Sequence, residues 1–123
     1  NTQEMADEIK NRYQGYSIYI YPDPASKQRK TSAGGFTDLS ILKNAGFNIR
    51  VRNNHPLIRD RINSVNAKLK NAKDVNSLFI ANNCKNVIKS LERQIYKEGT
   101  TIPDKDSGYD HRNDALGYMI EYL

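Results

Sequence analysis

The sequence predicts an α/β domain in which helices lie against a sheet. Segments with helical apolar spacing alternate with extended segments over most of the chain, and two segments with helical spacing end it. The apolar residues are periodic even though the mean hydropathy is only −0.78, so a folded chain is favoured over disorder. A length of 123 residues suits one compact domain, and we expect a single domain over residues 1–123.

The first half of the chain contains two predicted strands, each preceded by a short helix. Residues 4–13 place apolar side chains four apart, which is typical of a helix. Residues 16–23, "YSIYIYPD", are apolar on both faces and predict a buried strand. Thr37 is the expected N-cap of a helix over residues 38–45. Residues 47–52, "FNIRVR", alternate apolar and polar side chains, which predicts a strand with a basic outer face.

The second half is mainly helical by the same criterion. Residues 57–72 carry an apolar stripe at helical spacing, residues 86–96 carry another, and residues 109–123 form a last helix whose second half is apolar enough to be buried. Residues 77–82, "SLFIAN", are a short strand candidate. The stripe of residues 57–72 consists of Leu57, Ile58, Arg61, Ile62, Val65 and Leu69.

The charge of the chain indicates an anionic partner. The formal net charge is +5, and the lysines and arginines crowd the first two thirds of the sequence. A solvated basic face without a partner is the alternative. No apolar run is long enough to cross a bilayer, so we expect no membrane contact, and the single cysteine, Cys84, gives no sign of an oxidising compartment.

Acidic residues occur at two places where α/β proteins bind ligands. Asp23 follows a predicted buried strand, and ligands of such sheets gather at the carboxyl ends of strands. In the last helix Asp110, His111 and Asp114 are spaced so that they can share one face. Carboxylates of this kind bind hard divalent cations. The alternatives are structural: Asp23 begins a turn, Asp110 or Ser107 caps the helix, and His111 is a surface residue.

Two divalent cations can hold the attacking water and the leaving oxygen of a phosphodiester, while flanking lysines and arginines hold the DNA backbone. If the acidic residues bind metal, these features correspond to nuclease chemistry, and the structural alternatives stay open. The candidate DNA-binding residues are Lys27, Arg29, Lys30, Arg50, Arg52, Arg59 and Arg61.

Five stretches then resemble a known family in order and spacing. They are "YIYPDPASKQRK", "FTDLSILKNAGFNIRVR", "NHPLIRDRINSVNAKL", "CKNVIKSLERQIY" and "YDHRNDALGY". Together they resemble the carboxyl-terminal nuclease domain of the large terminase subunit of tailed bacteriophages. The most specific element is an H-x-x-D-A-x-x-Y pattern carried by His111, Asp114, Ala115 and Tyr118, together with Asp23 upstream.

The resemblance implies an RNase H-like fold, with a mixed sheet flanked by helices, and metal-dependent cleavage of double-stranded DNA. Concatemeric phage genomes are cut in this way at the start and end of packaging. It implies Asp23 and Asp114 as the second and third carboxylates of a triad that binds two Mg²⁺ or Mn²⁺ ions, with His111 beside them. Asp110 is a further candidate metal ligand, because its spacing lets it share a helix face with Asp114.

The same resemblance implies partners and a location. The partners are double-stranded DNA, the portal protein and the small terminase subunit. The location is the host cytoplasm, at the portal of the procapsid, or a bacterial cytoplasm if a prophage encodes the chain.

The chain departs from the family pattern in two respects. Lys27 follows Ser26 where family members often have glycine. The family's first catalytic aspartate lies on a hairpin before the first helix, and this chain begins at that helix, so we expect the first strands and one carboxylate to be missing. Weak metal binding, poor cutting and dimerisation through an exposed sheet edge are then expected of the chain alone.

Two other functions remain open at this point. The chain could be a non-catalytic DNA-binding or partner-binding module that uses its basic face, with Asp23 and Asp114 in structural roles. It could also be another RNase H-like phosphoryl-transfer enzyme, such as a junction resolvase or an integrase.

Overall fold

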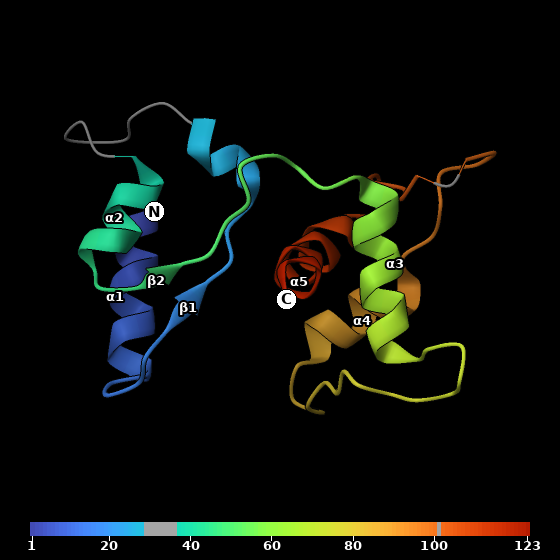
Figure 1. Ribbon diagram of the computed structural model, residues 1–123, viewed down its shortest axis with the longest axis horizontal. Coiled ribbons are helices and arrows are strands. Elements are labelled where there is room, and N and C mark those ends of the chain that lie inside the picture. Colours follow the sequence, from blue (N-terminus) through green and yellow to red (C-terminus); the bar gives the residue numbers. More distant parts are fainter. Residues whose placement is uncertain (29–36, 101) are drawn as a thin grey trace. The chain divides into compact units, whose positions relative to one another are not determined.

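The computed structural model describes residues 1–28, 37–100 and 102–123 (Figure 1). The contacts among these residues divide the chain into two compact units, Asn1–His55 and Pro56–Leu123. We call them the first unit and the second unit and describe each by itself.

Two capped helices belong to the first unit. Helix α1 spans Thr2–Arg12, and the Asn1 side chain caps it by accepting a hydrogen bond from the third helical N–H at 2.8 Å. Helix α2 spans Asp38–Asn44, and Thr37 Oγ1 accepts a hydrogen bond from the third helical N–H at 3.1 Å. Both helices lie where the sequence predicts them, and the predicted Thr37 cap is confirmed.

Two short parallel strands form the sheet of the first unit. Strand β1 is Tyr19–Ile20 and strand β2 is Asn48–Ile49. The pairing is continued by bonds from Asn48 N to Ile18 O at 2.9 Å and from Arg50 N to Ile20 O at 2.8 Å. The predicted positions of the strands are confirmed, but their predicted lengths are wrong. Among the described residues, each strand has the other as its one neighbour. Backbone pairing is therefore limited to the few residues of the two strands that lie opposite each other.

The prediction that the first strand is buried on both faces is also wrong. Tyr19, on one side of β1, is 47% exposed. Ile18 and Ile20 lie on the other side and pack against a core of three buried residues, Ala6 from α1, Leu42 from α2 and Phe47. Within the first unit, helices α1 and α2 therefore pack on the side of the strands that carries Ile18 and Ile20. Figure 1 shows both helices beside the two strands.

The second unit is built from three helices. Helix α3 spans Ile58–Leu69, helix α4 spans Lys85–Arg93 and helix α5 spans Asp110–Tyr122. Helix α5 packs against both of the others, with Val65 of α3 and Ile120 of α5 buried (Figure 1). No helix in the described ranges has the length and apolar composition that a membrane span requires.

Two expectations for the second unit are wrong. Residues 77–82 form no strand: the N–H groups of Ser77 and Leu78 both donate to Lys68 O at 2.8 Å, which ties this segment to the end of α3, and Phe79 is 79% exposed. Neither Asp110 nor Ser107 caps α5. The cap position is Tyr109, which makes no side-chain cap bond, and Asp110 is the first helical residue.

Candidate functional site

Asp23 lies directly after β1 and begins the 3₁₀ helix η1, Pro24–Gln28. Its Oδ1 accepts a hydrogen bond from Ala25 N at 2.9 Å, and its backbone oxygen accepts from the N–H and the hydroxyl of Ser26. The predicted turn role of Asp23 is therefore present. The carboxylate is 38% exposed, so the turn leaves it open to a ligand from solvent.

A histidine and a lysine lie at the same end of the sheet. His55 Nε2 is 3.6 Å from Asp23 Oδ1, and Lys27 Nζ donates to Asn53 Oδ1 at 2.7 Å. Asp23 and Lys27 follow β1, whereas Asn53 and His55 follow β2. Because the strands are parallel, the segments after them meet at one edge. The sequence analysis did not assign a function to His55. A signal was present, because His55 follows the second predicted strand in the same way that Asp23 follows the first.

Three predicted site residues of the second unit, Asp110, His111 and Asp114, lie on α5. Asp110 is 4% exposed, while the side chain of His111 is 83% exposed, with its Nδ1 3.9 Å from Asp110 Oδ2. Asp114 is partly buried and forms an ion pair with Arg61 of α3. Asp110, His111 and Asp114 all lie in the first turns of α5. Because Asp110 is buried and His111 is exposed, His111 does not share a face with Asp110 as the spacing predicts.

Arg61 is held by three residues of α5. Its guanidinium pairs with Asp114 and lies 4.8 Å from the ring centre of Tyr118. Its methylene chain crosses α5 at Gly117, where a Cβ atom would lie 2.6 Å from Arg61 Cγ. Asp114, Gly117 and Tyr118 therefore form a seat for one arginine, which we call the Arg61 seat. In this arrangement Tyr118, the last residue of the motif, contacts the Arg61 guanidinium through its ring.

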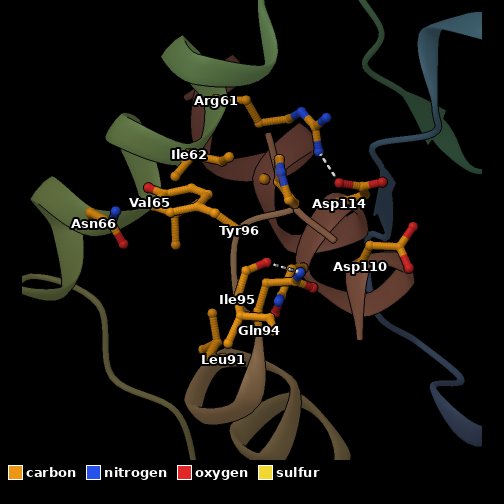
Figure 2. Close-up of a pocket in the computed structure, with 13 residues that line it drawn as sticks. Arg61, Ile62, Val65, Asn66, Leu91, Gln94, Ile95, Tyr96, Asp110 and Asp114 are labelled. Carbon is orange, nitrogen blue, oxygen red and sulfur yellow. Dashed lines mark hydrogen bonds and ion pairs between the residues drawn. The ribbon is translucent and has the colours of Figure 1, made fainter. Parts of the chain in front are cut away.

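A cavity of about 240 Å³ lies between the helices of the second unit (Figure 2). Arg61, Gln94, Asp110, Asn113 and Asp114 are among the residues that line it. Four buried side-chain atoms in the described part of the chain have no hydrogen-bond partner, and all four belong to these lining residues. They are Arg61 Nε, Gln94 Oε1, Asp110 Oδ1 and Asn113 Oδ1.

The orientation of the two amides is fixed by their other atoms. Asn113 Nδ2 donates to Ser90 O at 3.0 Å, and Gln94 Nε2 donates to Ile95 O at 2.9 Å and to Asp104 O at 2.8 Å. A flipped amide would place its oxygen against these carbonyl oxygens, so the unpaired atom of each amide is the oxygen. The cavity thus combines three unpaired acceptors with one unpaired donor.

The acceptors on α5 are of the type that divalent cations prefer. Carboxylate and amide oxygens bind Mg²⁺ and Mn²⁺, and buried oxygens without partners carry a cost that a bound cation removes. Asp110 Oδ1 and Asn113 Oδ1 are two such atoms, so this end of α5 fits a divalent ion. Across the described residues, no three acidic, histidine or cysteine side chains are grouped as a metal site.

The predicted DNA-binding residues differ in their surroundings. Lys27, Arg50, Arg52 and Arg59 are exposed, and the Arg50 guanidinium lies 4.2 Å from the ring centre of Tyr19. Arg61 is only 7% exposed and faces Asp114. Arg29 and Lys30 lie outside the described residues.

Sequence reasoning missed the contact between Arg61 and Asp114, yet a signal was present. Arg61 falls on the apolar stripe of its helix, and a charge on a buried face needs a counter-ion. Gly117, inside a helix and three residues after Asp114, is the other sign, because an internal helical glycine often marks close packing.

One further group is perturbed at the start of α5. The Arg93 guanidinium hydrogen-bonds the Tyr109 hydroxyl and lowers the pKa of that hydroxyl from its ordinary value of 10.0. The positive charges of Arg93 and Lys89 also lower this pKa, while desolvation opposes the shift. Two basic residues of α4 therefore surround the residue that precedes Asp110.

The family model described as "Terminase RNaseH-like domain" matches residues 1–123. Because this match covers the whole chain, the protein belongs to that family, as the resemblance predicts. The described helices and small parallel sheet are consistent with an α/β domain of the RNase H-like class. Comparisons with curated proteins and with solved structures gave no significant match.

Proposed function

We propose that this chain is the metal-dependent nuclease domain of a phage DNA-packaging terminase, which cuts concatemeric double-stranded DNA. The observation that supports this most strongly is the family match over residues 1–123. Asp114 of the H-x-x-D-A-x-x-Y pattern adds to it, because it lies on α5 near the unpaired buried oxygens of Asp110 and Asn113, which are of the type that divalent cations prefer.

The metal ligands we assign are Asp23 in the first unit and Asp110 and Asp114 in the second, with His111 as a neighbouring catalytic residue. Two bound Mg²⁺ or Mn²⁺ ions would activate water and neutralise the leaving oxygen. The chain itself would hold the DNA backbone through exposed lysine and arginine side chains. Of the exposed candidates, Lys27 lies closest in sequence to Asp23. Phosphate contacts of this kind position the substrate without reading its sequence.

The proposed setting is the packaging machine. Double-stranded DNA is the substrate, and the portal protein and the small terminase subunit are the proposed partners. Cutting would take place at the procapsid portal in the host cytoplasm, or in the bacterial cytoplasm for a prophage-encoded chain. Dimerisation of the isolated chain remains a further proposal, and a mass measured at several protein concentrations tests it.

Calorimetric titration with Mn²⁺ tests the proposed metal site. The wild-type chain should bind Mn²⁺, and Asp23→Asn and Asp114→Asn should each reduce binding, because each removes a charged oxygen ligand. Asp7→Asn is the matched control, since Asp7 is exposed on α1 and hydrogen-bonds only to Gln3 among the contacts described. Binding that is absent, or that survives both substitutions, contradicts the proposal.

A non-catalytic DNA-binding module is the second candidate, and two contacts favour it. Asp114 is engaged by Arg61, and Asp23 begins a turn, so both have structural roles. DNA affinity separates the candidates when it is measured without metal and then with Mg²⁺. In a binding module, Asp114→Asn should leave the affinity unchanged under both conditions. In a nuclease, Mg²⁺ should raise the affinity of the wild type, and this increase should be lost in Asp114→Asn.

A further inference from the structure

We propose that Arg61 is a positioning residue that holds Asp114 in the metal-free protein and competes with a divalent cation for its carboxylate. This inference rests on the proposed function, because it assigns a regulator to the Asp114 ligand. Its starting point is the Arg61 seat, the contacts of one buried arginine with Asp114, Gly117 and Tyr118.

Asp114 is the counter-ion of this arginine. Arg61 is 7% exposed, and a buried guanidinium requires an opposite charge and hydrogen bonds. The α5 helix accommodates the arginine by having no side chain at Gly117, where a Cβ would lie 2.6 Å and 2.9 Å from two carbons of the Arg61 stem. The position of the arginine is therefore built into the helix packing and is not a loose surface contact.

The same carboxylate cannot serve a guanidinium and a metal ion equally well. Arg61 donates to Oδ1 of Asp114 and so takes up part of the capacity of this carboxylate to bind a cation. The positive charge of the arginine also repels a cation bound to the carboxylate. Metal binding at Asp114 is therefore weakened while Arg61 stays paired, and a cation that binds through Oδ1 competes with the arginine for that oxygen.

The cavity beside the seat offers Arg61 another place. Arg61 Nε lacks a partner among the described residues, and it lines the cavity together with the unpaired oxygens of Gln94 and Asn113. Figure 2 shows the Arg61 side chain reaching from α3 to Asp114 across this space. An arginine that releases Asp114 would find neutral acceptors in the same cavity, which lowers the cost of the exchange.

Calorimetry with Mn²⁺ on variants of Arg61 tests this competition. Arg61→Gln keeps much of the stem and removes the charge, so it should raise the Mn²⁺ association constant roughly tenfold, the effect of removing one charge about 5 Å from a divalent ion in water. Arg61→Lys keeps the charge and should remain close to wild type. Arg112→Gln is the matched control, because it removes an exposed charge from α5 and should change binding less than about twofold.

The outcomes separate this inference from the proposed function. Unchanged or weaker Mn²⁺ binding by Arg61→Gln, together with loss of binding by Asp114→Asn, overturns the competition and leaves the metal site standing. An absence of Mn²⁺ binding in the wild type and in every variant contradicts both.

A measurement on the wild type covers the case in which Arg61→Gln fails to fold. The Nε–Hε NMR signal of Arg61 should shift when Mg²⁺ is added at concentrations that calorimetry shows to be saturating, while that of Arg112 should not. An Arg61 signal that stays in place while Mg²⁺ binds overturns the proposal.

Discussion

Replacing Gly117 with alanine tests the Arg61 seat directly. The new Cβ atom would lie 2.6 Å from Arg61 Cγ and 2.9 Å from Arg61 Cδ, well inside van der Waals contact. These carbons belong to the middle of the stem, and the guanidinium beyond them is held by Asp114 and Tyr118. The arginine cannot move aside without giving up those contacts.

Two opposing terms set the size of the effect. Overpacking of this kind costs about 1–3 kcal/mol, while alanine favours a helix over glycine by about 0.5–1 kcal/mol. We expect the second unit to lose about 1–2 kcal/mol of its free energy of unfolding, which lowers its urea midpoint by roughly 1 M. The assay is urea unfolding followed by the amide NMR signals of α5.

The background of Arg61→Ala gives the sharpest control. The three heavy atoms nearest to the new methyl group all belong to Arg61, so in the Arg61→Ala background Gly117→Ala should stabilise α5 by its helix propensity. The effect of Gly117→Ala on the free energy of unfolding should therefore change sign between the two backgrounds. A stabilising effect in the wild type, or the same effect in both backgrounds, refutes the packing argument.

Two further predictions concern the ends of helices. Thr37→Ala removes the hydroxyl that accepts from Ser40 N, so it should destabilise α2 by about 1 kcal/mol in urea unfolding, whereas Thr37→Ser should not. Arg93→Gln should raise the pKa of Tyr109 toward 10.0, measured by ¹³C NMR of the tyrosine ring, and an unchanged pKa contradicts the assigned cause. Because the folded-state pKa is lowered, this contact stabilises the fold fully above pH 10.0 and its contribution disappears as the pH falls through the folded-state value.

Local signals explain why the helices could be predicted. The apolar spacing and the Thr37 cap act within a few residues, and α1, α2, α3, α4 and α5 all lie where these signals place them. The strand lengths could not be predicted in the same way, because pairing depends on which neighbours a strand has. Residues 77–82 show this most clearly, since backbone bonds to Lys68 hold them without any strand partner in the described residues.

The candidate site was predictable in its acidic residues and not in its contacts. The spacing of Asp110, His111 and Asp114 places them on one helix, which the structure bears out. The pairing of Asp114 with Arg61 joins two helices that are far apart in sequence. The local signals at Arg61 and Gly117 indicate a buried charge and close packing, but they do not specify the partner. Asp23 and His55 come together for a similar reason, because the parallel pairing of β1 and β2 brings the segments after them to one edge.

The most direct test of the central claim is paramagnetic line broadening by Mn²⁺ in the amide NMR spectrum of the chain. If Asp114 and Asp23 bind the ion, substoichiometric Mn²⁺ should broaden the signals next to Asp114 and next to Asp23 at the same low concentration. Asp114→Asn should reduce that broadening. Broadening centred instead on exposed acids such as Asp7, with the Asp23 and Asp114 signals intact, would contradict the assignment of this chain as a metal-dependent nuclease domain.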